Sequence, residues 1–518
     1  MNTKISILNN FNYNNYFNAI LLLFPLLIIT GPALPDLIIS TSSLLILVFL
    51  LRGYLFKNKL FFFFIFFWLY LIISSFLSSE PIFSIKSSLL YIRFFVFSVG
   101  VYILIQNQKI LDYHFRIFFI IFIFLFFDAS IQYYTGNNLL DFKLISNRAS
   151  SFFRDELILG SFIYTFFPLV YFYYFKNSKI NLELKLIIFS IIIIYAIFLT
   201  GERINILRAI ILVFILNFLF MKFRIFLSFI LIFILFFVTI LFSTSFKERF
   251  YDDFKLRLGI GVEKTFMDSH WGGIYLTSYE LFKRNFLIGI GPNNYRNLCD
   301  LNDIKKNKLY VDIKQSLKKQ NMIVIELQRD RFHNLLYRNN LPVVYRNNYI
   351  LKKNYEIIIS NNNNLITKFY LIDENKYIDG YYSKSNFKPY TLDLKLIENN
   401  YISKEEYEKT VNIKSNSWNI ACTTHPHHLL IQIATETGIL GLVLFLSNIL
   451  LLFKLISRKK NKENLIFVTI GYIYIFNMVN PFFTYGNFFN NYTNIFFWFF
   501  IVQLFLILKF LNNRNSNV

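Results

Sequence analysis

The sequence predicts an all-α polytopic membrane protein with about twelve transmembrane helices and one long external loop. Composition is the first observation: 55% of the 518 residues are hydrophobic and 16% are charged, whereas a soluble protein typically carries about 25% charged residues. The second observation is that the apolar residues, which include 66 phenylalanines, occur in long blocks. The third is a polar stretch at 244–430, which separates most of these blocks from the last ones.

Transmembrane helices are predicted wherever an apolar block approaches the length of a span. A helix needs about 20 predominantly apolar residues to cross a bilayer, and the block Leu60–Leu77 is a clear example. The predicted spans are 16–33, 35–51, 60–78, 84–105, 115–134, 157–175, 184–200, 204–221, 225–243, 431–455, 465–483 and 489–511.

Short connections that contain Lys and Arg alternate with connections that lack them. The run Arg458–Lys462 is strongly basic, whereas 31–35, 78–81 and 481–487 contain neither residue. Cytoplasmic loops carry an excess of Lys and Arg, so both termini are predicted to be cytoplasmic and the loops after odd-numbered spans external. We attribute the formal charge of +22 to this bias and to contact with anionic membrane lipid, not to nucleic acid.

The chain therefore divides into three predicted parts. Residues 1–243 hold spans one to nine, 244–430 form a periplasmic loop with an irregular Asn- and Lys-rich insertion, and 431–518 hold spans ten to twelve. A loop of this length is usually functional or disordered. Within it, the segment KFYLIDENKYIDGYYS at 368–383 predicts a β-hairpin, because two apolar and aromatic runs flank a polar turn.

Two arginines mark the predicted outer end of span eight. Arg203 follows Gly201 and Glu202, and Arg208 lies five residues deeper, inside the apolar run. An ionisable residue within a span is costly and usually faces a cavity or a partner, and the guanidinium fork binds phosphate oxygens well. The alternative is that Arg203 snorkels to the surface or pairs with Glu202. Both interpretations stay open from the residues alone.

A histidine cluster, Thr423–His428, stands immediately before span ten and holds three of the six histidines. Histidine titrates near neutral pH and suits general acid–base catalysis. Pro426 restricts the backbone at His425 to extended conformations, so we expect successive rings to point in different directions. Because no zinc-type ligand spacing accompanies the cluster, no metal site is expected.

Two further segments carry glycines and charges. The segment Gly289–Arg296 contains GIGPNN, which we interpret as a tight turn because the βαβ context of a nucleotide site is lacking; Arg296 is a separate candidate for anion contact. Glu436 and Gly438 lie early in span ten. Glu436 is nine residues from His427, about two and a half turns at 3.6 residues per turn, so we expect it to brace the helix or an arginine.

The stretch CTTHPHHLLIQIATETGILG at 422–441 resembles the signature of the O-antigen ligase family, C-S-T-H-P-H-N-x-x-x-Q-x-x-x-E-x-G-x-x-G. The family also includes O-antigen polymerases. The resemblance implies that His427 is catalytic, with His425 and Glu436 beside the substrate. One residue departs from the signature, because His428 stands where the family usually has Asn.

Other blocks are similar to the same family, in the same order along the chain. FKRNFLIGIGPNNYRNLCD carries Arg296 and Cys299, and MDSHWGGIYLTSYELF places His270 where many members have Arg or His. LTGERINILRA resembles the family's arginine block, and RASSFFRDELILGSF resembles a short external block. The resemblance implies substrate-binding roles for Arg203, Arg208, Arg296 and His270.

The implied reaction transfers a glycan from undecaprenyl diphosphate to an acceptor hydroxyl on lipid A-core, without a nucleotide sugar or a cofactor. The implied location is the bacterial inner membrane, with the active face periplasmic. Two alternatives stay open: a polymerase that extends a growing glycan acceptor, and a lipid-linked glycan transporter. A transporter usually shows inverted repeats and charges near mid-membrane, and we find no such repeat.

The two cysteines, Cys299 and Cys422, both fall in the predicted periplasmic loop beside motif blocks. Disulfides persist in the oxidising periplasm, so we predict a Cys299–Cys422 bond that anchors the two ends of the insertion.

Overall fold

The computed structural model describes residues 13–50, 59–145, 148–222, 270–299 and 424–515, together with seven short strands between 327 and 403. The chain forms two compact units. The first consists of residues 1–247, 282–295 and 425–518, and the second of residues 248–281 and 296–424.

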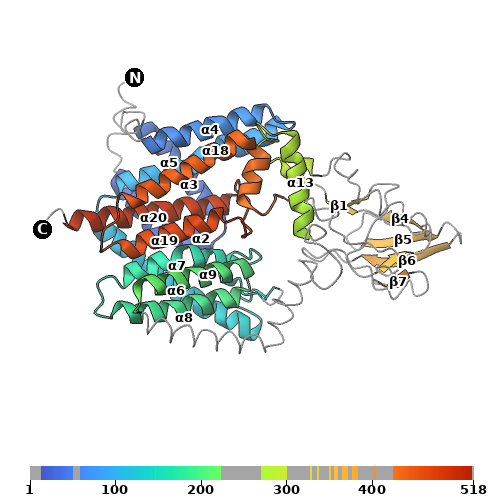
Figure 1. Ribbon diagram of the computed structural model, residues 1–518. Helices are drawn as coiled ribbons and strands as arrows, with labels where there is room; N and C mark the ends of the chain where they lie inside the picture. Colours follow the sequence, from blue (N-terminus) through green and yellow to red (C-terminus); the bar gives the residue numbers. More distant parts are fainter. Residues whose placement is uncertain are drawn as a thin grey trace, which may run out of the picture. The chain divides into compact units, whose positions relative to one another are not determined.

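Helices make up the described part of the first unit and lie side by side in one bundle (Figure 1). Eleven of the twelve predicted spans coincide with a helix, and the ninth, 225–243, lies outside the described residues. These helices are α2 (Tyr13–Ile29), α3 (Ala33–Leu50), α4 (Lys59–Phe76), α5 (Pro81–Leu104), α6 (Gln108–Thr135), α7 (Leu159–Tyr174), α8 (Leu182–Thr200), α9 (Arg203–Phe220), α18 (Leu429–Ser457), α19 (Leu465–Val479) and α20 (Asn491–Asn515).

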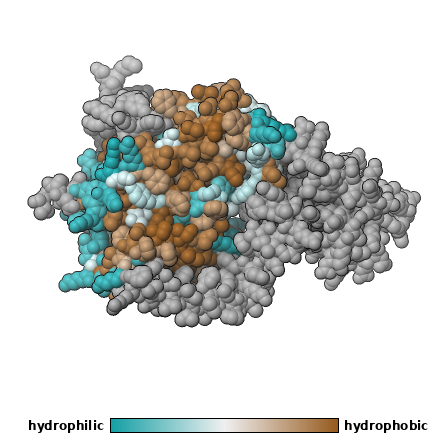
Figure 2. Space-filling model, viewed as in Figure 1, coloured by the Kyte–Doolittle hydropathy of each residue, from teal (hydrophilic) through white to brown (hydrophobic). Residues whose placement is uncertain are grey.

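Within the described residues, six helices are long and apolar enough to cross a membrane: α5, α6, α8, α9, α18 and α20. Hydrophobic side chains cover much of the bundle surface in Figure 2, with hydrophilic residues mainly along the left of the view and at the upper right. Ile82 and Leu450, for example, are 81% and 68% exposed. Soluble monomers rarely expose such extended apolar surfaces, so the structure supports a helical membrane protein. The total of twelve spans stays a prediction.

Helix α20 forms the centre of the bundle. In its apolar window, 89% of the residues are buried, and it contacts α3, α5, α7 and α19. Helix α7 is likewise buried on nearly all sides. Helices that are apolar all round are expected in such central positions.

Local residues set several helix ends. The side chain of Asn181 caps α8 by accepting a hydrogen bond from the Leu184 N–H at 2.8 Å, and Gly201 ends α8 in the left-handed region with φ of 57°. Asn and Gly are favoured residues for these two positions. The short turn at Gly201 places Glu202 and Arg203 at the start of α9.

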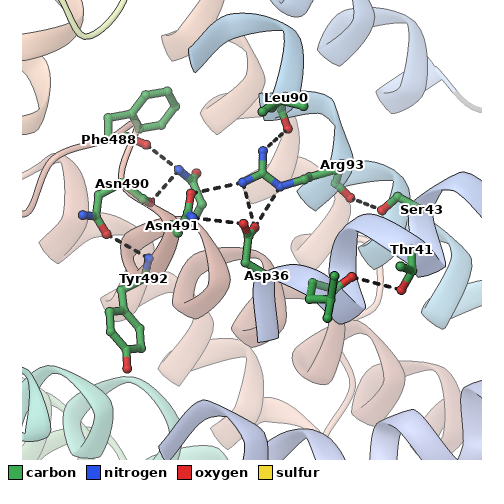
Figure 3. Close-up of polar contacts among 11 residues, drawn as sticks. Asp36, Thr41, Ser43, Leu90, Arg93, Phe488, Asn490, Asn491 and Tyr492 are labelled. Carbon is green, nitrogen blue, oxygen red and sulfur yellow. Dashed lines mark hydrogen bonds and ion pairs between the residues drawn. The ribbon is translucent and has the colours of Figure 1, made fainter. Parts of the chain in front are cut away.

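An ion pair that the sequence analysis did not single out joins three helices. Arg93 of α5 donates from Nε and Nη2 to Asp36 Oδ1 of α3 at 2.9 and 2.7 Å, and from Nη2 to Asn491 Oδ1 of α20 at 3.1 Å (Figure 3). Asn491 also donates to Asp36 Oδ2. Both charged groups fall at or within predicted spans, where an ion pair satisfies groups that lipid cannot. The triad therefore fixes the start of α20 against α3 and α5.

In the second unit the described residues include most of α13 (His270–Arg284) and the strands. The predicted hairpin is confirmed: β5 (Leu365–Leu371) pairs antiparallel with β6 (Lys376–Tyr382), and Leu371 stands opposite Lys376. The other strands are β1 (Leu327–Arg329), β2 (Leu335–Tyr337), β3 (Tyr349–Leu351), β4 (Tyr355–Ile359) and β7 (Tyr401–Ser403), which pair as β1–β2, β3–β7 and β4–β5.

Candidate functional site

The turn at 480–488, between α19 and α20, is the centre of the candidate site. Four side chains from α9, from α18 and from the segment before α18 bind its backbone: Arg208, His425, His428 and Gln432. Three of the four were singled out in the sequence. The turn itself carries no charge, and the sequence analysis did not single it out as part of a site. Its Asn and Pro residues do indicate an irregular backbone, whose N–H and C=O groups can bind side chains.

The imidazole rings of His425 and His427 lie against each other, with centroids 4.0 Å apart and planes tilted by 48°. The expectation that these rings point in different directions is therefore wrong. The rings meet because the backbone of His427 has a φ of 55° and turns the chain back on itself. A non-glycine residue in this left-handed region costs on the order of 1–3 kcal/mol and is held there by its surroundings.

Tyr485 supplies those surroundings with its two backbone groups. Its N–H donates to the carbonyl of His427 at 2.8 Å. Its carbonyl lies 3.3 Å from Nε2 of His425, and because a carbonyl only accepts, His425 is the donor and carries its proton on Nε2. One residue of the turn thus holds both histidines.

His427 is half-buried, and burial lowers its pKa to about 4. The imidazole is therefore neutral at physiological pH, which is the protonation state that a general base requires. The pKa lies below the near-neutral range that histidine usually has.

His428 acts as the N-cap of α18. Its Nδ1 accepts from the Ile431 N–H at 3.3 Å, and its Nε2 donates to the Pro481 carbonyl at 2.9 Å. Burial lowers its pKa, which keeps it in the neutral form that both bonds need. Asn is among the best N-cap residues, so this histidine has a structural function that Asn could also perform.

Glu202 and Asn205 connect the arginines of this region. Glu202 Oε1 accepts from the Gly160 N–H at 2.9 Å at the start of α7 and lies 3.8 Å from Nη2 of Arg148. Asn205 donates to Glu202 and accepts from Nη1 of Arg208 at 3.2 Å. Burial raises the pKa of Glu202, while Arg148 and these hydrogen bonds oppose the shift. The network ties α7, α9 and the loop before α7 together.

Arg208 is 8% exposed and sits beside the aromatic rings of Tyr164, Phe483 and Tyr485, at 5.6–6.0 Å. Its Nη2 donates to the Thr484 carbonyl at 2.8 Å, and its Nε has no hydrogen-bond partner in the described part of the chain. Among the described residues, no carboxylate lies within ion-pair distance of it. Arg203, by contrast, is half-buried at the first position of α9.

Glu436 is a fully buried residue of α18. Its carboxylate accepts from the N–H groups of Asn293 and Tyr295, at 3.0 and 3.3 Å, and from Gln432 at 3.0 Å. As expected from the spacing, it braces structure and does not orient His427, but it braces the 293–295 loop. Gln432 links Glu436 to the 480–488 turn, because its side chain also donates to Asn487 at 2.8 Å.

Gly438 breaks α18, with φ of 67°. The segment 286–291 fills the break: the N–H groups of Ile290 and Gly291 donate to the carbonyls of Thr435 and Glu436, and the Ile439 N–H donates to the Phe286 carbonyl. A Cβ at Gly438 would lie 2.4 Å from the Leu287 carbonyl, and one at Gly289 would lie 2.4 Å from the Gly438 nitrogen. The glycines of both motifs are therefore needed for close backbone contact, and GIGP is a structural turn, as expected.

The remaining predicted residues belong to the second unit. His270 is the first residue of α13, and Arg296 is an exposed residue of α14 (Tyr295–Leu298). Cys299 is buried and disulfide-bonded; its predicted partner, Cys422, lies outside the described residues. Within the described residues no group of three or more His, Cys, Asp or Glu side chains has the arrangement of a metal site.

Comparison of the chain with models of known protein families, and with curated proteins, found no match.

Proposed function

We propose that this protein is a membrane glycosyltransferase that moves a glycan from undecaprenyl diphosphate to an acceptor hydroxyl of lipid A-core, on the periplasmic face of the bacterial inner membrane. The observation that carries the proposal is the convergence of the His425–His427 pair and the arginines of α9 on one end of the helical bundle. A neutral base beside cationic groups, at the edge of an apolar bundle, suits a substrate with a lipid tail, an anionic leaving group and a polar glycan.

In the proposed reaction the acceptor oxygen attacks the anomeric carbon of the donor. The bond from that carbon to the diphosphate oxygen breaks, and undecaprenyl diphosphate leaves with the electron pair. His427 takes the proton of the acceptor hydroxyl. Arg203 contacts the diphosphate and stabilises the charge that develops on it. The apolar faces between helices receive the polyprenyl tail.

Polymerisation is the alternative within the same chemistry, with a growing lipid-linked glycan as the acceptor. No described residue separates the two acceptors. A transporter is disfavoured because the histidine pair and the arginine network lie together at one end of the bundle and not along a path through it.

Reconstitution of the full chain in liposomes, with an undecaprenyl-diphosphate glycan and lipid A-core, tests the proposal. Mass analysis of the products should show the glycan joined to lipid A-core and free undecaprenyl diphosphate. Joined repeat units without lipid A-core would identify a polymerase. Movement of intact donor across the bilayer, with no new bond, would identify a transporter and refute the proposal.

The contact of Arg203 with diphosphate is testable in the same system. Arg203→Lys keeps the charge but loses the planar fork that matches two phosphate oxygens, so both Arg203→Lys and Arg203→Ala should weaken donor binding and turnover. Intact donor affinity and turnover in Arg203→Ala would remove Arg203 from the site.

A further inference from the structure

Arg208 is connected to His427 through a single peptide group. The Thr484 carbonyl, which accepts from Nη2 of Arg208 at 2.8 Å, and the Tyr485 N–H, which donates to the His427 carbonyl at 2.8 Å, are the two polar groups of the same peptide unit. A peptide unit is planar, and none of the described ones is cis, so its C=O and N–H point in opposite directions. A guanidinium that fixes the carbonyl on one side therefore fixes the direction of the N–H on the other.

The charge of Arg208 also strengthens this connection. A cationic donor on a peptide carbonyl polarises the peptide, and its N–H becomes a better donor to the next group in the chain. The bond that benefits is the one that holds His427, whose φ of 55° needs external support. The carbonyl of the same Tyr485 holds His425, so both rings of the pair depend on this turn.

Arg208 is itself held from the helix side. Its Nη1 is bound to Asn205, and Asn205 is bound to Glu202 and to Ser161 of α7. The guanidinium is thus held between α9 and the 480–488 turn by groups of the protein itself, which is the arrangement of a supporting residue.

We propose that Arg208 is a positioning residue: through the Thr484–Tyr485 peptide it sets the orientation of the His425–His427 pair. This inference differs from the substrate-contact assignment suggested by the family resemblance. It rests on the proposed function for the role of His427 as base, but the geometry it describes is independent of that role.

The test uses the full chain, labelled with ¹⁵N-histidine and placed in lipid nanodiscs. Imidazole ¹⁵N signals report the tautomer and surroundings of each ring. In Arg208→Gln we expect the signals of His425 and His427 to move while those of His114, buried between α2, α6 and α20, stay fixed. We also expect undecaprenyl diphosphate, the probe ligand, to bind as it does to the unchanged protein.

Asn217→Ala provides a matched control on the same helix. Asn217 is also buried in α9 and donates to Ser190 at 3.0 Å, but it has no connection to the turn, so the histidine signals should stay in place. If Arg208→Gln does not fold, Asn205→Ala should shift the same two signals by a smaller amount, because it removes one anchor of the guanidinium and leaves the charge.

Two outcomes would overturn the inference. One is that the signals of His425 and His427 stay unchanged in Arg208→Gln and in Asn205→Ala. The other is loss of undecaprenyl diphosphate binding in Arg208→Gln with unchanged histidine signals, which would make Arg208 a ligand contact. In the transfer assay, Arg208→Gln should lower kcat by about 10²-fold and leave KM for the donor unchanged. If His427→Ala retains transfer, the proposed function fails, but the signals still decide the role of Arg208.

Discussion

His427 combines two properties at the residue scale: a left-handed backbone and a neutral, half-buried ring. Its carbonyl is anchored by Tyr485, and its ring lies against His425. A side chain held in this way is preorganised, so little free energy is needed to reorient it during the reaction. The two neighbouring histidines have partners that assign them to support.

His427→Ala should therefore lower the rate of glycan transfer by about 10²–10⁴-fold, the usual effect of losing a general base. His425→Ala should cost less, and His428→Asn should be nearly neutral because Asn also caps a helix. Turnover of the three variants at matched membrane levels is the measurement. Near-normal turnover in His427→Ala, with loss in one of the neighbours, would move the base to that neighbour.

The pH dependence of transfer follows from the lowered pKa of His427. The base form is the neutral ring, and with a pKa of about 4 it is fully present from about pH 5 upward. As pH falls through 4 the ring is protonated and the rate should fall about tenfold per pH unit. A rate profile that already declines near pH 6.5 would indicate a base with the ordinary histidine pKa.

At the scale of the secondary-structure elements, the main feature is the break in α18 at Gly438. Gly438 lets the backbone of 286–291 enter the helix and bind groups that the break leaves unpaired. Backbone groups of this kind need a partner in any apolar surrounding, so the two motifs depend on each other although they are far apart in the sequence.

Gly438→Ala should destabilise the protein more than Gly136→Ala does. Both glycines have positive φ, which costs a Cβ about 1–2 kcal/mol, but a Cβ at Gly136 meets nothing within 4 Å. At Gly438 it also collides with the Leu287 carbonyl. Thermal unfolding of the two variants in the same detergent is the measurement. Equal losses of Tm would mean that the 286–291 segment does not occupy the break.

Orientation in the membrane is the prediction at the scale of the whole molecule. The turn between α18 and α19 carries Arg458, Lys459, Lys460 and Lys462, and Asn464 holds it to the end of α20 by donating to Asn512 at 2.9 Å. A basic turn is expected on the cytoplasmic side. Topology reporters at Asn461 and at Asn363, in the long loop, should therefore report opposite sides. Reports from the same side would refute the span count.

The sequence by itself determined where most of the helices lie, although several predicted ends differ from the observed ones by a few residues. Apolar length, Asn before a helix and Gly after it act locally, so the predicted spans coincide with described helices and the turn at Gly201 places Arg203 at a helix start. The sequence also singled out the histidine cluster, because three histidines close together, directly before an apolar block, can be recognised without a structure.

Only the tertiary structure decided what these residues contact. Besides its neighbours on α9, Arg208 contacts the carbonyl of Thr484. Besides Gln432 of the same helix, Glu436 contacts the N–H groups of Asn293 and Tyr295, and Gly438 faces the carbonyl of Leu287. Each of these partners is a backbone atom, which every residue type provides. The chemistry of a side chain can be read from the sequence, but its backbone partner is known only once folding has brought a particular peptide group next to that side chain.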